Sequence, residues 1–330
     1  QKDLDDGIDT IGKKMTVCQL YAKQIRHRGN VRYNTKNGRK RLMKLLEEDK
    51  LGGCPIDSVK LSDAKEWAIR MKEKGISYKT ISNDKRSLKA AFYTAIQDDC
   101  IRKNPFDFQL NTVIEDDTEP KVPLTPAQEE SFLSFAQNDK VYQKYYDELI
   151  ILLGTGLRIS ELCGLTDTDI NFENRIINVD HQLLRSAETG YYIETPKTKS
   201  GIRQIPMSEK VYEAFNRVLK RRRGAKAVTI DGYSNFFFLN RDGYPKTATN
   251  YDGMFRGLAK KYNKYHEEAL PKVMTPHTLR HTFCTNMANA GMNPKALQYI
   301  MGHSNITMTL NYYAHATFDS AKAEMLRIAA

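Results

Sequence analysis

The chain has 330 residues, of which 40% are hydrophobic and 28% charged, and its formal net charge is +11 at pH 7. This length allows two domains of about 100–200 residues each. The charge points to a polyanionic partner, nucleic acid before membrane, because the sequence has no apolar span of about 20 residues and no basic amphipathic anchor. Its five cysteines are scattered without Cys-x-x-Cys spacing and are expected to be reduced thiols. Because the chain begins at Gln1 and not at Met, we expect it to be a truncated form.

The first third of the chain predicts a helical and basic unit. Apolar residues at helical spacing predict helices from Thr16 to about Ile25, from Ser62 as the cap to Gly75, and from Ser77 to Ile101. The last of these places Ile81, Leu88, Phe92 and Ile96 on its inner face. A basic run and the outer stripe of the long helix supply cations that can follow a phosphate backbone, although a solvated charged face is the alternative. These cations are Arg39, Lys40, Arg41, Lys79, Lys85, Arg86 and Lys89.

A polar and acidic segment, NTVIEDDTEPKVP, ends at Pro123 and is typical of a linker between domains. We therefore expect a helical unit over residues 1–114, a linker over 115–123 and a second domain over 124–330.

The second domain is predicted to open with a helix capped by Thr125, followed by a helix over Tyr145–Leu153 that ends at Gly154. A glycine turn then leads to Arg158, with Glu161 three residues later. This pair has the spacing of an ordinary helix ion pair, worth a few tenths of a kcal/mol. The preceding glycines, however, let backbone and arginine approach a ligand closely.

Three short β-like runs follow, at Arg175–Val179, Tyr192–Glu194 and Ile202–Pro206. The segment PKTKSG at 196–201 is expected to be a basic hairpin tip between the last two. It carries Lys197 and Lys199, which are two exposed lysines on a turn when considered alone.

The stretch 275–315 contains four of the seven histidines. Thr275 and the following proline predict a helix start, with Leu279, Phe283 and Met287 as the buried stripe and Gly291 beyond its end. Asn293 opens a second helix, and Gly302 closes it directly before His303. His277 and Arg280, three residues apart, are expected to share a different face of the first helix.

These side chains favour an anion over a metal. HTLRH has two histidines four residues apart, but Thr278 stands where a zinc protease has Glu, and Arg280 adds a cation. Arginine offers a planar fork of donors to phosphate, and histidine can donate to a phosphoryl oxygen or move a proton. The alternative is that each histidine is an ordinary hydrogen-bonded residue.

HTLRHTFCTNMANAGMNPKALQYIMGHSNITMTLNYYAH and the earlier GTGLRISELCGL resemble, in this order and separation, the two conserved boxes of the tyrosine recombinases, the phage-integrase family. The sequence is most similar in character to integrases of conjugative transposons. The resemblance implies a mainly α fold with a small β-sheet and hairpin, in which a helical core-binding domain and an α+β catalytic domain clamp DNA. It also implies a site-specific recombinase that cuts and rejoins DNA through a 3′-phosphotyrosine intermediate and a Holliday junction, with no metal, ATP or other cofactor.

The resemblance also assigns roles. Arg158 and Arg280 stabilise the charge on the scissile phosphate, and His277 and His303 complete the set of groups around that phosphate. The lysine segment supplies the proton donor for the leaving 5′-oxygen; Lys197 is the preferred residue and Lys199, also a DNA-binding candidate, is the alternative. Tyr312, nine residues beyond His303, is the preferred nucleophile, whereas a Tyr-x-His rule would select Tyr313 and align it with His315.

The implied partners are double-stranded DNA (transposon ends and target), a homo-oligomer that is a tetramer in the synapse, and an excisionase or DNA-bending accessory protein, in a bacterial cytoplasm and without a membrane. A final amphipathic helix over 318–328 is expected to dock on a neighbouring protomer. Two alternatives are a type IB topoisomerase, which only relaxes supercoils, and a non-catalytic helical DNA-binding protein. The latter leaves Arg158, the lysine segment and Tyr312 unrelated.

Overall fold

The computed structural model describes residues 14–29, 31–119, 122–222, 228–313 and 325–326, and the chain divides into two compact units, Gln1–Pro120 and Lys121–Ala330. The division falls inside the segment that the sequence assigns to a linker. No helix within the described ranges is both long and apolar enough to cross a membrane.

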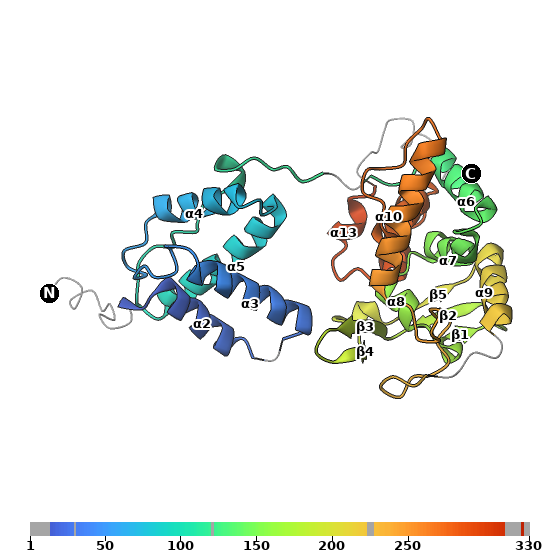
Figure 1. The fold of residues 1–330 in the computed structure, drawn as a ribbon, viewed down its shortest axis with the longest axis horizontal. Helices are drawn as coiled ribbons and strands as arrows, with labels where there is room; N and C mark the ends of the chain where they lie inside the picture. The colour runs from blue at the N-terminus through green and yellow to red at the C-terminus, as the bar shows by residue number, and fades with distance from the viewer. Residues whose placement is uncertain (1–13, 30, 120–121, 223–227, 314–324, 327–330) are drawn as a thin grey trace. The chain divides into compact units, whose positions relative to one another are not determined.

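The first unit, blue to cyan-green in Figure 1, is helical. Its α2 packs against both α3 and α5. The core between the helices contains Trp67, Phe92 and Phe106, all fully buried, and the rings of Trp67 and Phe106 meet edge to face with centroids 5.8 Å apart. Its elements are α2 (Val17–His27), α3 (Tyr33–Glu47), α4 (Leu61–Glu73), α5 (Tyr78–Gln97) and the 3₁₀ turn η2 (Leu110–Thr112).

Two predicted helix bounds in this unit are wrong. Ser62 does not cap α4, because the helix begins at Leu61, where the side chain of Asp63 accepts the backbone N–H of Lys60. The long helix α5 stops at Gln97, and residues 98–101 turn away through Asp99, which has a positive φ of 54°. The predicted inner residue Ile96 is consequently only half-buried.

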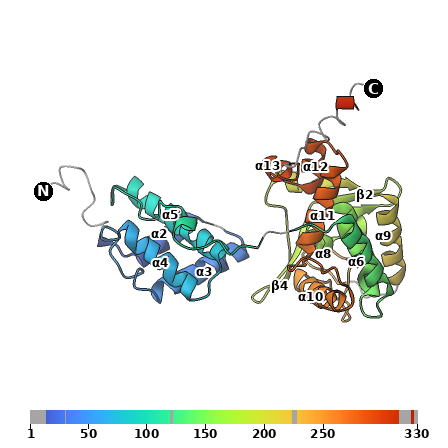
Figure 2. The ribbon, with the colours of Figure 1, turned by 90° about the horizontal axis from the view of Figure 1, so that it is seen from above.

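The second unit has helices around two small antiparallel sheets. Helix α7 packs against α9 and α11, and α12 and α13 follow one another at the end of α11 (Figure 2). Its helices are α6 (Pro126–Asn138), α7 (Tyr146–Thr155), α8 (Ile159–Gly164), α9 (Glu209–Arg222), α10 (Ala248–Tyr265), α11 (Pro276–Asn289), α12 (Pro294–Met301) and α13 (Thr307–Leu310), with 3₁₀ turns η3 (Gln143–Tyr145), η4 (Asp167–Asp169) and η5 (Lys199–Gly201).

The first sheet has the order β1-β2-β5, and β3 and β4 form a separate hairpin. The strands are β1 (Ile170–Asn171), β2 (Ile176–Val179), β3 (Gln182–Ser186), β4 (Gly190–Glu194) and β5 (Arg203–Pro206). β5 pairs with β2 and β4 with β3, with Ile177 opposite Ile205 and Leu184 opposite Tyr192. The prediction that 196–201 is a hairpin tip is therefore wrong: this segment connects the two sheets.

The predicted end of α7 at Gly154 is also wrong. The helix continues to Thr155 and ends at Gly156, which adopts a left-handed φ of 63°. A Cβ at position 156 would lie 2.5 Å from the ring of Phe283 on α11, so this glycine is required both by its conformation and by close packing. The turn delivers Arg158 directly to the start of α8.

Candidate active site

Arg158 is the N-cap residue of α8, and its backbone N–H donates to Oε2 of Glu161 at 2.8 Å. Its guanidinium donates from Nη1 to Oε1 of Glu161 at 2.7 Å and from Nη2 to the carbonyl of Gly302 at 3.0 Å. The side chain keeps 37% of its surface exposed, which leaves part of the fork available to a ligand. The ordinary ion pair considered from the sequence is thus present, and the hydrogen bond from Arg158 to Gly302 links the two sequence boxes.

Arg280, on α11, is 3% exposed. Its guanidinium donates to the carbonyl of Gly156 at 2.5 Å and to the carbonyl of Met301. Burial, followed by the charge of Arg158, lowers the pKa of Arg280 to about 9, so the group is still protonated at pH 7. Arg158 and Arg280 therefore donate to consecutive carbonyl groups at the end of α12, immediately before His303.

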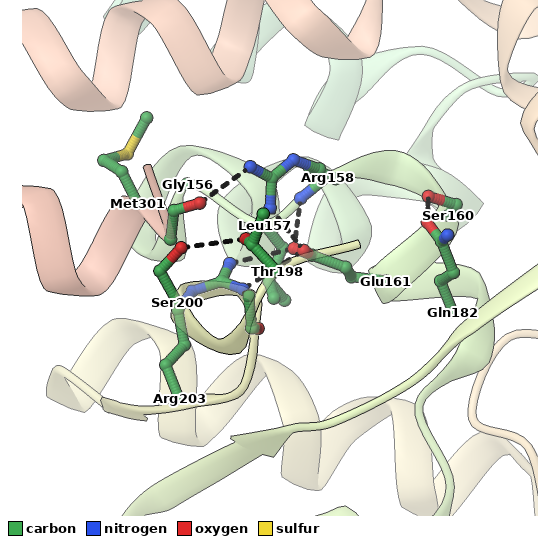
Figure 3. A network of polar contacts seen from close by, with 12 residues as sticks. Gly156, Leu157, Arg158, Ser160, Glu161, Gln182, Thr198, Ser200, Arg203 and Met301 are labelled. Atoms are coloured by element: carbon green, nitrogen blue, oxygen red, sulfur yellow. Dashed lines mark hydrogen bonds and ion pairs between the residues drawn. The ribbon is translucent and has the colours of Figure 1, made fainter. Parts of the chain in front are cut away.

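Glu161 is 3% exposed and binds a second arginine, Arg203. Figure 3 shows this carboxylate between the guanidinium groups of Arg158 and Arg203. Burial raises the pKa of Glu161, but the hydrogen bond and charge of Arg203, with the charges of Arg158 and Arg280, lower it to about 2. Glu161 is therefore an anion at neutral pH. It offsets part of the positive charge of Arg158, Arg203 and Arg280, which together form the arginine cluster.

Arg203 is a residue that the sequence interpretation missed. A signal was present: in the short strand RQIP, Arg203 and Ile205 are buried while Gln204 and Pro206 are exposed. An arginine on the inner face of an alternating strand needs a buried partner. The pattern, however, does not say which carboxylate that partner is.

His303 is 5% exposed and follows Gly302, whose φ is 60°. Its Nδ1 lies 3.0 Å from the hydroxyl of Thr309. Burial, and then the charges of Arg280 and its neighbours, lower the pKa of His303 to about 4. The imidazole is therefore neutral at pH 7.

His277 lies in the first turn of α11 and is exposed, whereas Arg280 is buried. Its charge is among the causes that lower the pKa of His303, which places His277 near the cluster. The opening of α11 at Thr275–Pro276 is as predicted, with Leu279 and Phe283 buried.

The sequence interpretation treated Tyr312 and Tyr313 as neighbours on a helix, but they lie in the turn after α13. The hydroxyl of Tyr313 donates to the carbonyl of Met292 at 2.5 Å. The ring of Tyr312 lies 4.8 Å from that of His281, centroid to centroid. Burial raises the pKa of Tyr312 and outweighs the lowering by Arg280, so the cationic surroundings alone do not ionise this hydroxyl.

Lys197 and Lys199 are exposed, and among the described residues neither makes a hydrogen bond or ion pair with the arginine cluster. The segment that carries them is fixed at its end, where the carbonyl of Gly201 accepts from Nη1 of Arg203 at 3.0 Å. The lysines are thus tethered next to the cluster but are not part of it.

The cations predicted to bind DNA in the first unit are partly engaged within the protein. Arg41 pairs with Asp84, Lys89 pairs with Asp107, and Lys85 donates to a backbone carbonyl, each at 2.5 Å. Lys85 and Lys89 are half-buried, not fully outward as expected. The exposed members of the set are Lys40, Arg41, Lys79 and Arg86, while Arg39 is half-buried.

Within the described part of the chain, Asp169, Asp180 and His181 have the spacing of a metal-binding group. Both ring nitrogens of His181 are engaged, with Asp180 at 2.6 Å and with the carbonyl of Gly164 at 2.8 Å. Asp169 accepts from the N–H and hydroxyl of Thr166. These hydrogen bonds within the protein account for the arrangement of the three side chains.

Two arginines, a neutral histidine and a half-buried tyrosine around one turn suit the stabilisation of a phosphoryl group. The sequence profile of the Phage integrase family matches residues 123–320, more than half of the chain. The chain therefore belongs to the phage integrase family of tyrosine recombinases, and the resemblance found in the sequence is confirmed.

Relatives cover nearly all of the chain. The "Transposase from transposon Tn916" of Enterococcus faecalis is 69% identical over 99% of this chain and 81% of its own length, and the "Transposase from transposon Tn1545" of Streptococcus pneumoniae has the same identity and coverage. A structure of the Tn1549 transposon integrase with a circular intermediate DNA matches 95% of this chain and 99% of that chain, with a TM-score of 0.91 and 78% identity.

A lambda integrase dimer on a core site shares the fold at 16% identity, with a TM-score of 0.61 over 90% of this chain and 76% of that chain. The predicted fold class, mainly helical with small antiparallel sheets, is confirmed by these matches and by the observed elements.

Proposed function

We propose that this protein is the integrase of a mobile element of the conjugative-transposon type, which cuts and rejoins DNA through a 3′-phosphotyrosine intermediate and a Holliday junction. One observation carries the proposal: Arg158 and Arg280 bind the consecutive carbonyl groups of Gly302 and Met301, so that both guanidinium groups converge beside His303. A cluster with this much positive charge is costly to bury without an anion. Glu161 offsets one of the three arginine charges and a phosphodiester would offset a second, which leaves one for the negative charge that develops in the transition state.

The DNA in the similar structures supports transposon ends as the substrate. One Tn1549 integrase structure contains a circular intermediate DNA and another contains the transposon right end. At 78% identity over nearly the whole chain, the same class of substrate is the simplest expectation here.

The substitutions in the Tn1549 integrase structures support Tyr312 over Tyr313. One of those proteins carries an arginine-to-lysine substitution and another a tyrosine-to-phenylalanine substitution. The two substituted positions are separated by the same number of residues as Arg158 and Tyr312 in this chain. In addition, the hydroxyl of Tyr313 is already engaged with Met292.

In the proposed cleavage step, the hydroxyl oxygen of Tyr312 attacks the scissile phosphorus. A Tyr–O–P bond forms, the P–O5′ bond breaks, and the phosphate stays attached to the 3′ side of the cut. The tyrosine proton leaves to a base, for which exposed His277 is the candidate, and the leaving 5′-oxygen takes a proton from Lys197, with Lys199 as the alternative. The phosphodiester energy is kept in the new bond, so that the 5′-hydroxyl of a second strand can reverse the step.

The buried residues act on charge in this scheme. Arg158 and Arg280 donate to the non-bridging oxygens as negative charge develops on them. His303 is neutral, and when the hydroxyl of Thr309 donates to its Nδ1, the proton resides on Nε2 and is available to the phosphate. Guanidinium groups thereby supply electrostatic stabilisation that a metal ion supplies in other phosphoryl-transfer sites.

We further propose that residues 1–114 form the core-binding domain and 124–330 the catalytic domain, joined by a linker at 115–123. Exposed Lys79 and Arg86, in the first and third turns of α5, would contact the phosphate backbone. The tetrameric synapse, an accessory protein and a bacterial cytoplasmic location are part of the same proposal. The tail helix expected over 318–328 lies almost entirely outside the described residues.

The test is incubation with a nicked suicide duplex made from the ends of the element that encodes this chain. A covalent protein–DNA complex that survives denaturant is expected from wild type and not from Tyr312→Phe. Paired full sites should also yield a Holliday junction. Relaxation of supercoils without junctions would favour the topoisomerase alternative, and binding without any adduct would favour the non-catalytic one.

A further inference from the structure

Arg203 is the first residue of β5, and its side chain is completely buried. Its two terminal nitrogens donate to the two carboxylate oxygens of Glu161, at 3.1 Å and 2.9 Å. Nε donates to the carbonyl of Ile300 at 2.6 Å, and Nη1 also donates to the carbonyl of Gly201 at 3.0 Å. One guanidinium therefore joins α8, the last turn of α12 and the end of the lysine segment, and Figure 3 shows Arg203 beside Glu161.

The same side chain packs against the turn that presents His303. A Cβ at Gly302 would lie 3.1 Å from Nη1 of Arg203 and 3.0 Å from the carbonyl oxygen of Ser200. The lysine segment and Arg203 thus approach the turn so closely that a side chain at position 302 would be tightly crowded. Because the carbonyl of Gly302 also accepts from Arg158, the position of each group depends on the others.

Arg203 has no exposed surface with which to contact DNA, unlike Arg158, which is 37% exposed. Its guanidinium makes four hydrogen bonds to protein oxygens, which suits a positioning role and not a ligand contact. Lysine in its place would keep the charge but lose the planar fork that reaches Glu161 and Gly201 together. The lysine segment would then lose its connection to the cluster.

We propose that Arg203 is a positioning residue that fixes the lysine segment 196–201 against Glu161 and the Gly302 turn, and so places the proton donor of that segment at the leaving 5′-oxygen. This inference rests on the proposed function, because it assumes that a lysine of the segment acts as that donor. It assigns to Arg203 a role that is separate from phosphate binding.

The experiment compares two otherwise identical suicide duplexes, one with the normal 5′-oxygen at the scissile phosphate and one with sulfur in that bridging position. When the P–S bond breaks, the thiolate leaves without needing a proton, so cleavage no longer depends on a placed lysine. Arg203→Lys is expected to lower the cleavage rate of the oxygen duplex about 100-fold, the lower range for loss of general acid catalysis. The sulfur duplex should be cleaved within about 10-fold of wild type, and DNA affinity should be unchanged.

Arg175→Lys is the matched control, because Arg175 is an ion-paired arginine of the same sheet region, partnered by exposed Glu209. It should leave both rates unchanged. If Arg203→Lys does not unfold cooperatively, Gly201→Ala replaces it. A Cβ at position 201 would lie 2.3 Å from Cβ of Pro196, which displaces the segment while Arg203 keeps Glu161. The same preference for the sulfur duplex is expected.

Equal losses on the oxygen and sulfur duplexes would overturn the positioning role, as would a wild-type rate on both. The proposed function fails separately: in that case wild-type protein forms no covalent complex with either duplex, whatever residue stands at position 203.

Discussion

The arginine cluster and the lysine segment are neighbours in this structure but differ in burial and in the number of contacts that hold their side chains. Glu161, Arg280 and His303 are each at most 5% exposed and their polar atoms are held by named partners. Lys197 and Lys199 are exposed on a bend between two sheets. The first region is organised before any substrate arrives, whereas the second is attached only at its end.

This difference suits the two tasks proposed for them. Stabilising charge on a phosphate is most effective when the donors are already fixed, since no reorganisation is then needed during the reaction. Donating a proton requires a group that reaches the leaving oxygen at the right moment, and a mobile lysine on a tethered segment can do so. Substitutions in one region at a time test this difference.

The largest effect is expected at the nucleophile, which borders the buried cluster. Tyr312→Phe should remove the covalent complex entirely while DNA affinity stays within about two-fold, because only the attacking oxygen is lost. Tyr313→Phe is the matched control and should retain cleavage, at the cost of its hydrogen bond to Met292. Mass spectrometry of the trapped adduct identifies the residue, and a nucleotide on Tyr313 would reverse the assignment.

Next in size is the loss of a fixed arginine. Arg280→Ala should lower cleavage by about 10³-fold, the upper range for removal of one preorganised donor. Binding should change little, because affinity is distributed over many surface cations. Filter binding and single-turnover cleavage measure the two quantities on one sample. Thermal unfolding must accompany them, since Arg280 also holds Gly156 and Met301.

A parallel fall in affinity and cleavage of that variant would contradict its proposed role at the transition state. Arg217→Ala serves as the control: Arg217 also pairs with a buried carboxylate, Asp147, but lies on α9. It should leave cleavage unchanged.

The exposed segment should show a smaller effect, and one that depends on the substrate. Lys197→Ala is expected to slow cleavage of a normal duplex about 100-fold and to be restored by bridging sulfur at the leaving position. Lys199→Ala should show only a weakened contact to DNA. If the two results are exchanged, Lys199 is the donor and the preference between them was wrong.

The sequence predicted the elements better than it predicted the contacts between them. Caps at Thr16, Ser77 and Thr125 mark the true helix starts, because side-chain capping is a local interaction. The end of α7 was misplaced because two glycines, Gly154 and Gly156, offered the same signal. Both are closely packed, Gly154 against Val211 and Gly156 against Phe283, but only Gly156 adopts the left-handed φ that ends the helix, and this conformation is not visible in the sequence.

The site shows the same limit. The two boxes indicated the residues that would meet. The strand pairing, which makes the lysine segment a connection between two sheets and not a hairpin tip, depends on contacts between residues that are distant in sequence. Arg203 was missed for that reason: its partners Glu161 and Ile300 are 42 and 97 residues away in sequence. No local pattern encodes such a contact.

The smallest effect concerns pH and distinguishes the buried cluster from exposed groups. The pKa of His303 is lowered to about 4 in the folded protein by burial and by the charges of Arg280, Arg158, Arg203 and His277, against a usual value near 6.5. The folded state therefore binds this proton less readily than the unfolded chain. Its contribution to stability is complete above pH 6.5 and is lost as the pH falls towards 4.

By pH 5 the loss in the free energy of unfolding should be on the order of 2 kcal/mol, because the pKa of His303 is about 4 in the folded protein and near its usual value in the unfolded chain. His303→Gln lacks this titration, so urea unfolding of the two proteins between pH 8 and pH 5 should give curves that converge as the pH falls. Glu161 titrates lower, since its pKa of about 2 places its loss of stabilisation below pH 4.5, and it contributes equally to both proteins in this window. Parallel curves would mean that His303 has the same pKa in the folded and unfolded states, as expected of an exposed group. The contrast between the two regions would then not hold at this residue.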